Sequence, residues 1–273
     1  MSAKHDLTIP ILPDRYYHIY NRGIAKQSIF FKIENYEYFL RKYSEKLSCY
    51  VETYAYCLLD NHFHLFIKPH SIDMILAQAT KDFEIVNETF MKDYVLPWLD
   101  RIDLDKQEHK DLTNLSNLLN LLDLFAKHGD IQTNLDPQPE NLKTSSFIDQ
   151  LCSWIISERL RGFMLGYAKA INKQQNRTGS LFQKGFRRKY VSDVDHEKKL
   201  VLCYIHHNPI HHFYSNNYEE YKWSSYNTYF SEQATKLSRT EALKWFDNIY
   251  EFHKFSTEYK KIKKSHNWII EEE

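Results

Sequence analysis

Residues 50–69 read YVETYAYCLLDNHFHLFIKP. Apolar, aromatic and β-branched side chains fill both halves of this stretch, and Asp60-Asn61 between them is a turn pair. The pattern predicts two strands, at residues 50–59 and 62–68, which pair tightly in an antiparallel sheet.

The second of these strands carries His62 and His64. Side chains at i and i+2 of a strand point to the same face, so the two imidazoles lie side by side. Repulsion between two imidazolium ions disfavours protonating both, which leaves neutral ligands for one divalent ion at neutral pH. The alternative is a pair of histidines packed on a half-exposed sheet face.

The flanking sequence alternates between strand and helix patterns. Aromatic residues predict a strand at 15–22, and apolar residues at helical spacing predict a helix at 34–47. This order favours an α+β fold with an antiparallel sheet and helices packed on it. Further along we expect a long helix at 147–176, a strand or hairpin arm at 181–191, a helix at 193–207 that Pro209 stops, and a helical region at 239–264.

The composition excludes several classes of protein. The chain has 273 residues with 36 Lys+Arg and 36 Asp+Glu, so its net charge neither requires nor excludes a nucleic-acid partner. Its six glycines fit no dinucleotide or phosphate-binding loop, and its four cysteines form no CxxC pair. We find neither a signal peptide nor an apolar run of roughly 18 residues, so we expect a protein of the reducing cytoplasm with free thiols.

Charge is unevenly distributed along the chain. Residues 71–145 hold fourteen acids and seven bases among Leu-rich runs, which indicates an acidic, mostly helical insertion. The alternative for this segment is a plain solvated helical subdomain. Residues 227–273 form a second addition, a helical C-terminal extension.

The sign reverses between residues 152 and 190, which contain nine bases and one acid. A basic strip with interleaved aromatic residues is typical of contact with phosphate backbones and unstacked bases, and the alternative is a solvated helix face. Candidates for stacking on bases are Tyr16, Tyr17, Phe182 and Phe186, although core packing is favoured for each of them. The candidate DNA-binding residues are Arg159, Lys169, Lys173, Arg177, Lys184, Arg187, Arg188 and Lys189.

A second candidate constellation is the segment YIHHNP at residues 204–209. Tyr204 and Asn208 are one helical turn apart and share a face, so a phenol nucleophile can stand beside an amide oxygen that completes a metal site. Pro209 biases Asn208 away from regular helix. His206 and His207 are further candidate ligands. His211 and His212 are candidates as well, although a surface position is favoured for both because they lie beyond the proline.

Together these features resemble the HUH single-tyrosine transposases. The shared features are His-apolar-His on a strand, a basic helix, the segment Gly179-Ser180-Leu181-Phe182-Gln183 and then Tyr-Ile-His-x-Asn-Pro. The most similar branch is the REP-associated tyrosine transposases. Matching stretches run from 15 to 69 and from 146 to 226, about half of the chain.

The resemblance implies a role for each matching residue. His62 and His64 correspond to paired metal ligands, Tyr204 to the nucleophile and Asn208 to a third ligand. It also implies a ferredoxin-like antiparallel sheet, divided here between residues 1–70 and 146–226. The implied cofactor is Mg²⁺ or Mn²⁺, and the implied partner is single-stranded DNA that contains hairpins.

The implied reaction is metal-assisted transesterification through a 5′-phosphotyrosine, which serves DNA transposition or the processing of repeated hairpins. A free phenol has a pKa near 10, so an ion or a positive field from Arg187, Arg188 and Lys189 must assist Tyr204. We expect a monomer or homodimer associated with the nucleoid. The alternatives are a DNA-binding regulator without catalysis and a metal-dependent nuclease that uses water.

Overall fold

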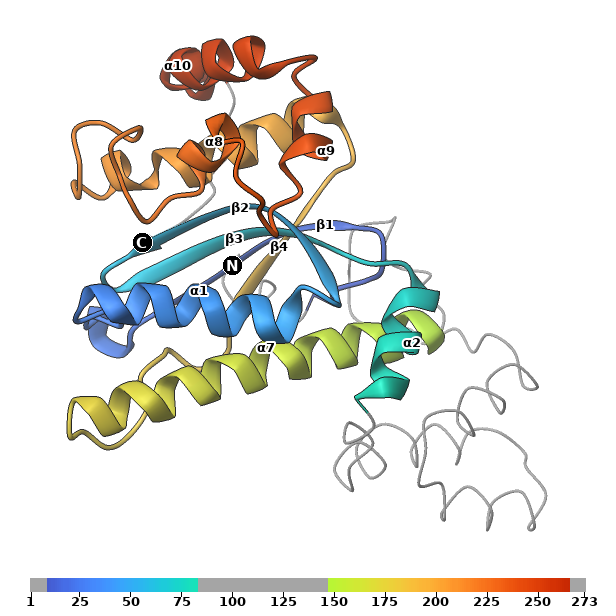
Figure 1. The fold of residues 1–273 in the computed structure, drawn as a ribbon, viewed down its shortest axis with the longest axis vertical. Helices are drawn as coiled ribbons and strands as arrows, with labels where there is room; N and C mark the ends of the chain where they lie inside the picture. The colour runs from blue at the N-terminus through green and yellow to red at the C-terminus, as the bar shows by residue number, and fades with distance from the viewer. Residues whose placement is uncertain (1–8, 83–146, 266–273) are drawn as a thin grey trace.

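The computed structural model describes residues 9–82 and 147–265 (Figure 1). Most of the elements expected from the sequence are present. In chain order they are β1 (Tyr16–Arg22), the 3₁₀ turn η2 (Ile24–Lys26), α1 (Ile33–Leu47), β2 (Val51–Leu59), β3 (His62–Pro69), α2 (Ile72–Lys81), α7 (Phe147–Gln174), β4 (Arg187–Val191), α8 (Asp195–His211), the 3₁₀ turn η5 (Tyr226–Phe230), α9 (Arg239–Lys244) and α10 (Ile249–Ser265).

The four strands form one antiparallel sheet in the order β2-β3-β1-β4. The predicted tight strand pair is β2 and β3, and α1 connects β1 to β2. β3 therefore lies inside the sheet, where His64 is opposite Tyr20 of β1 and Cys57 of β2. This arrangement confirms the predicted α+β class with helices packed on an antiparallel sheet.

Each face of the sheet has its own apolar core. Alternate residues of β3, including Phe63 and Leu65, face α1 and α7, where Phe39 packs on Phe63 with ring centroids 5.0 Å apart. On the opposite face Phe66 packs with α8 and the C-terminal helices, and in Figure 1 these helices cover the side of the sheet opposite α1 and α7. A register slip by one residue would exchange the two faces and bury His64 in the other core, so the apolar pattern fixes where the imidazoles point.

The strand expected at 181–191 is shorter than predicted, since β4 begins at Arg187. The preceding segment pairs with the sheet only through an isolated bridge between Gly23 and Phe182. Gly179 and Gly185 have φ of 87° and 74°, a left-handed conformation that interrupts a regular strand and favours glycine. The segment is therefore a loop alongside α7.

The prediction that Pro209 stops the helix is wrong. α8 continues to His211, and the N–H of His212 donates to the carbonyl of Asn208 at 3.0 Å. A proline removes one N–H donor and crowds the preceding turn of the helix. Near the C-terminal end, the residues after the proline can still form their own hydrogen bonds and complete the last turn. His212 therefore caps α8 two turns after Tyr204.

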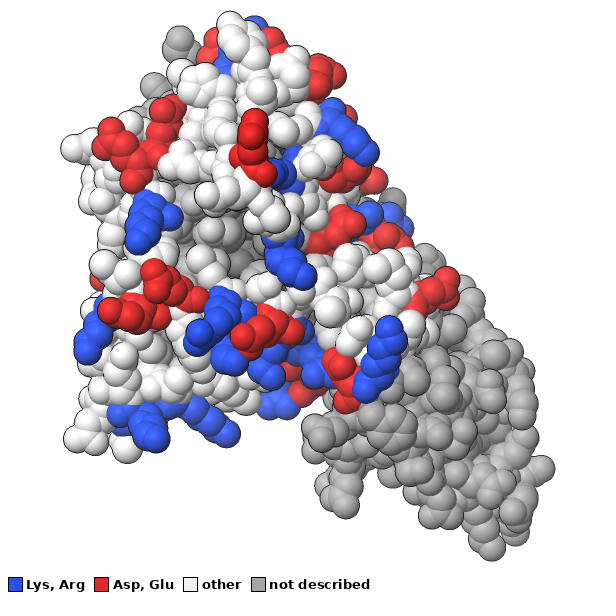
Figure 2. Space-filling model, in the orientation of Figure 1, with Lys and Arg blue, Asp and Glu red and all other residues white. Residues whose placement is uncertain are grey.

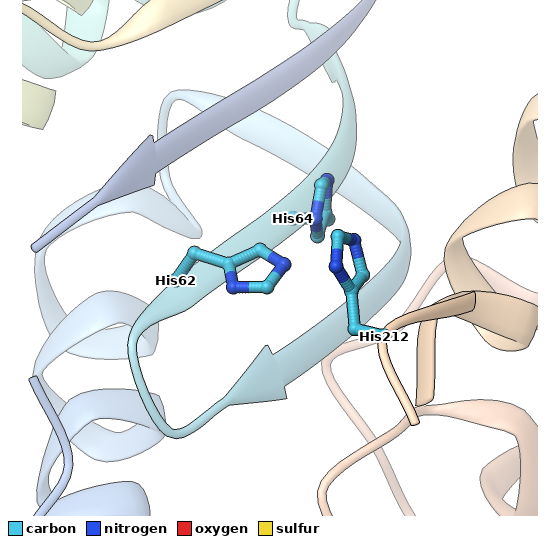
Figure 3. Close-up of side chains that lie close together, drawn as sticks. All are labelled: His62, His64 and His212. Atoms are coloured by element: carbon cyan, nitrogen blue, oxygen red, sulfur yellow. The ribbon is translucent and has the colours of Figure 1, made fainter. Parts of the chain in front are cut away.

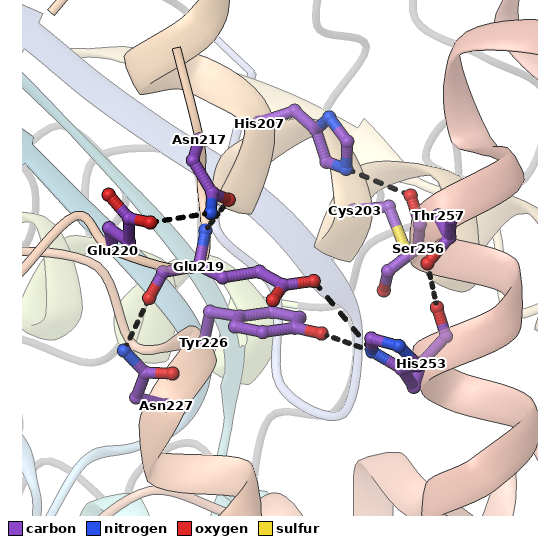
Figure 4. Close-up of polar contacts among 10 residues, drawn as sticks. All are labelled: Cys203, His207, Asn217, Glu219, Glu220, Tyr226, Asn227, His253, Ser256 and Thr257. Carbon is purple, nitrogen blue, oxygen red and sulfur yellow. Dashed lines mark hydrogen bonds and ion pairs between the residues drawn. The ribbon is translucent and has the colours of Figure 1, made fainter. Parts of the chain in front are cut away.

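The predicted helical region at 239–264 is two helices, α9 and α10, divided near Asp247, whose φ is 70°. α10 is fastened to the outer side of α8 (Figure 4). The ring N–H of His207 donates to the carbonyl of Ser256 at 2.9 Å, and Cys203 Sγ lies 3.4 Å from Ser256 Oγ. The C-terminal extension thus holds the helix that carries Tyr204.

Most of the predicted acidic insertion, residues 83–146, lies outside the described residues, and only α2 at its start is seen. The boundaries proposed for the insertion and for the C-terminal extension remain predictions. Across the two described ranges, no helix is both long and apolar enough to cross a membrane.

Candidate metal centre and nucleophile

Three imidazoles converge where β3 meets the end of α8. His62 and His64 come from β3 and His212 from the C-cap of α8, and their rings turn toward one another (Figure 3). Each offers one nitrogen, and these three nitrogens lie within 4.8 Å of one another. His62 and His64 are buried, and His212 is half-buried.

This donor set fits a transition-metal ion. Metal–imidazole bonds are about 2.0–2.1 Å long, so two nitrogens on one ion lie at most about 4.2 Å apart, and a modest rotation of the rings would close the cluster. Neutral imidazoles are ligands of Zn²⁺, Cu, Fe and Ni, and they suit Mg²⁺ poorly, because Mg²⁺ prefers oxygen. The three histidines could therefore hold a divalent metal.

Two neighbouring side chains orient the rings of the β3 histidines. Nδ1 of His62 donates to Oδ1 of Asn61 at 2.6 Å, and Nδ1 of His64 lies 2.9 Å from Nε2 of His18 on β1. When the Nδ1 of a metal-ligating histidine donates its proton to such a partner, Nε2 keeps the lone pair for the metal. Asn61 Oδ1 can only accept, so Asn61 selects this tautomer for His62, and His18 does the same for His64 when its Nε2 takes the acceptor role. Neither residue was predicted in this role from the sequence.

Tyr204 lies beside this cluster on α8. Its ring centroid is 5.8 Å from that of His64 and 5.7 Å from that of His18, with both pairs edge to face. The side chain is 4 % exposed, and the half-buried His211, 5.6 Å away between centroids, lies on the more open side. The predicted nucleophile and the predicted metal ligands therefore share one site.

The other predicted ligands are placed differently. Asn208 is fully buried and helical, its amide N–H donates to the carbonyl of Tyr204 at 3.0 Å, and its Oδ1 accepts no hydrogen bond from the described residues. Its role as a third ligand remains a prediction. His206 and His207 point to other partners, Ser225 and the α10 backbone.

His212 was among the candidate ligands in the sequence, but a surface position beyond the proline was favoured for it, and that preference was wrong for its role. The available signal was spacing. Residues 204, 208 and 212 follow one another at single helical turns, which places them on one side of a helix only if that helix continues through Pro209.

The cysteines take no part in this chemistry. All four are free thiols, as expected. Burial raises the pKa of Cys203 to about 12, so this thiol on α8 stays protonated at neutral pH.

The residues of the predicted basic strip are divided among α7, β4 and the loop between them. Arg159, near the middle of α7, forms an ion pair with Asp82 at the end of α2, 2.8 Å away. Arg188 bonds to Ser157 of α7 at 3.1 Å, whereas its neighbour Arg187 on β4 is opposite Tyr20 on the other face of the sheet.

Arg187 and Lys189 therefore share the sheet face that carries the metal cluster. Lys189 is opposite His18, and Arg187 is opposite Tyr20, whose other neighbour is His64. Residues directly opposite in an antiparallel pair point to the same side. Two positive charges thus lie in the row of residues next to the candidate site, where they would favour an anion.

Of the four remaining candidates, Arg177 donates to the carbonyl of Ser180 at 3.2 Å, and two border a groove of about 340 Å³ between α7 and the loop at 179–186. Lys169 and Lys184 line it, together with the buried rings of Phe182 and Phe186. In Figure 2 basic side chains without acidic neighbours gather over the C-terminal end of α7, whereas elsewhere on this face the two signs are mixed. Such a groove is suited to a phosphate backbone.

The four aromatic residues proposed to stack on bases are core residues. Tyr17 is fully buried, and the other three are 6–7 % exposed. The hydroxyl of Tyr17 accepts the backbone N–H of Leu12 at 2.9 Å, so the ring is fixed within the protein. The core packing that the sequence favoured for Tyr16, Tyr17, Phe182 and Phe186 is therefore confirmed, and these rings are not available to stack on bases.

Neither a protein-family model nor a curated protein sequence matches the chain. One solved structure, described as a REP-associated tyrosine transposase bound to a REP hairpin, aligns with a TM-score of 0.42 and 8 % identity, covering 81 % of this chain and 82 % of that one. At this level the alignment carries no inference about function. The functional assignment therefore rests on the site itself.

Proposed function

We propose that this protein is a DNA-strand transferase of the HUH single-tyrosine type, which cleaves and rejoins single-stranded DNA. The observation that carries the proposal is the contact between Tyr204 and His64 within a cluster of three histidines. The strand order β2-β3-β1-β4 with its helical connections supports a ferredoxin-like core, divided between residues 1–70 and 146–226.

The residues that would hold the ion are His62, His64 and His212. A divalent ion bound there would polarise a phosphate oxygen and stabilise the charge that develops on it. Of the two ions expected from the sequence, Mn²⁺ suits an all-nitrogen set better than Mg²⁺ does. Asn61 and His18 keep the rings in the ligating tautomer, so binding loses little entropy to their orientation.

The side chains of this site divide the chemistry of the reaction. The phenol oxygen of Tyr204 attacks phosphorus, the bond between phosphorus and the 3′ oxygen breaks, and a 5′-phosphotyrosine and a free 3′-hydroxyl result. Tyr204 loses its hydroxyl proton and the departing oxygen gains one. Arg187 and Lys189 support a negatively charged phosphate beside the sheet. The covalent link conserves the phosphodiester, so rejoining needs no nucleotide cofactor.

The proposed substrate is single-stranded DNA with hairpins, bound along the basic groove beside α7 by a monomer or homodimer in the nucleoid-associated cytoplasm. The test is a covalent-adduct assay. Labelled DNA from the flanks of the protein's own gene is incubated with the protein and Mn²⁺ or a chelator, then separated under denaturing conditions. We expect a metal-dependent adduct that the Tyr204→Phe variant lacks while it still binds DNA.

Tyr218→Phe is the matched control, because this buried tyrosine packs on His207, on the outer side of α8. It should form the adduct as wild type does. Cleavage without an adduct, or an adduct in Tyr204→Phe, would refute the nucleophile and favour a nuclease that uses water. Binding without cleavage would favour a DNA-binding regulator.

A further inference from the structure

Phe213, which follows the candidate metal ligand His212 at the C-cap of α8, is displayed on the surface. Its side chain is 96 % exposed, the largest exposed fraction among the large apolar residues in the described part of the chain. Its φ is 61°, the left-handed conformation that usually falls to glycine or asparagine at this position of a helix. A phenylalanine here therefore has two unfavourable features, an apolar ring in water and a strained backbone.

The position of the ring is nevertheless fixed. The backbone N–H of Phe213 donates to the carbonyl of Ile210 at 3.2 Å, and the N–H groups of Tyr214 and Ser215 both donate to the carbonyl of Pro209, at 2.8 and 3.1 Å. These bonds wrap the chain back over the last turn of α8. Exposure of Phe213 is thus a property of an ordered turn.

The turn is also tied to the strand that carries His62. The hydroxyl of Tyr214 donates to Asp60, in the turn that joins β2 to β3. Burial and then Asp60 raise the pKa of Tyr214, and Arg22 of β1, which is opposite His62, opposes this rise. An exposed aromatic ring, a guanidinium and a candidate metal ligand therefore lie at one rim.

We propose that Phe213 is a platform on which one unpaired base of the DNA strand stacks while the adjoining phosphate lies at the histidine cluster. Consecutive Cα atoms are about 3.8 Å apart, so the Cα of Phe213 lies about that far from the Cα of His212. An exposed flat ring beside a phosphate-binding site suits a nucleobase, because every base offers a π-face. Strained residues that ordered structure holds in place are found at ligand sites.

This inference rests on the proposed function, and its test separates the two. The Phe213→Asn variant removes the ring and suits the left-handed backbone, so it should raise Tm by about 2–4 °C. The same variant should bind single-stranded DNA about 5- to 150-fold more weakly, the range measured for the loss of one base–aromatic stack. Phe213→Trp should bind as tightly as wild type or more tightly.

The assay measures the Kd and cleavage KM of short strands in which one nucleotide at a time is abasic. The difference in Kd between Phe213→Asn and wild type should disappear for the strand whose abasic nucleotide adjoins the cleaved phosphate. Tyr250→Asn is the control, since this ring is 70 % exposed on α10, and it should leave the Kd unchanged. If wild type cuts DNA and Phe213→Asn binds every strand equally well, the platform is wrong and the proposed function stands. If wild type neither binds nor cuts DNA, the platform and the proposed function are both wrong. If Phe213→Asn converts a dimer to a monomer, the ring contacts a second copy of the chain and the platform is wrong.

Discussion

The hydrogen bond between His18 and His64 leads to a prediction about metal affinity. In His18→Phe the stacked ring is kept but its nitrogens are lost, so Nδ1 of His64, in a fully buried side chain, loses the partner at 2.9 Å. An unsatisfied buried donor costs about 1–3 kcal/mol. At about 1.4 kcal/mol per factor of ten, this cost corresponds to a roughly 5- to 150-fold weaker Kd for the ion, in the range seen when the hydrogen-bond partners of metal ligands are removed.

The measurement is a titration of Co²⁺ or Mn²⁺ into folded protein by calorimetry, with the visible spectrum of bound Co²⁺ as a second signal. His18→Gln supplies an amide oxygen that accepts the same bond, and it should recover most of the affinity. His70→Phe is the control, because His70 follows β3 at its far end. Unchanged affinity in His18→Phe, or equal losses in His18→Phe and His70→Phe, would refute the orienting role.

Three further predictions concern the ligand set, the charged edge and the stability of the fold. His212→Ala should abolish tight metal binding, whereas Asn208→Ala should weaken it far less, and calorimetry ranks the two variants directly. The reverse order would favour Asn208 over His212 as the third ligand. Replacing Arg187 and Lys189 by Gln should reduce the slope of log K against log salt for single-stranded DNA by about 1.4, and an unchanged slope in filter binding would place the DNA elsewhere. Burial lowers the pKa of His206 from 6.5 to about 3, so the folded state stays unprotonated while the unfolded state takes up a proton below pH 6.5. Stability should therefore fall by about 2 kcal/mol from this residue between pH 7.5 and 5, and denaturation of His206→Gln should lack that part of the pH dependence.

The fold could be predicted from the sequence to the extent that it depends on local pattern. The alternation around His62 and His64 predicts both the strand and the face that the two residues share, and the turn at Asp60-Asn61 predicts the pairing. The same local rules failed at Pro209, where helix continuation depends on the packing of α8 between the sheet and α10. Propensity is a weak prior, and tertiary packing overrides it.

The candidate site was only half predictable for a related reason. His62 and His64 are neighbours on one strand, whereas His18 reaches them across the sheet, and sequence spacing carries no signal for that contact. His212 comes from the end of a helix, and its spacing from Tyr204 is a signal only if the helix continues through Pro209. Burial also separated residues of similar appearance. Tyr17 and Phe182 are aromatic like Phe213, but they lie in the core. Phe213 is exposed, and it follows His212, for which a surface position had been favoured.

The two sides of α8 explain why histidines adjacent in sequence serve different purposes. His206 and His207 face Ser225 and α10, and their hydrogen bonds hold the helix in place. His212 and Tyr204 approach β3, where the imidazoles of the strand converge with them. Because one helix carries both sets, the packing of the C-terminal extension and the geometry of the candidate site are linked. A change at Ser256, the partner of His207 far from the histidine cluster, would therefore be expected to move Tyr204 relative to His64.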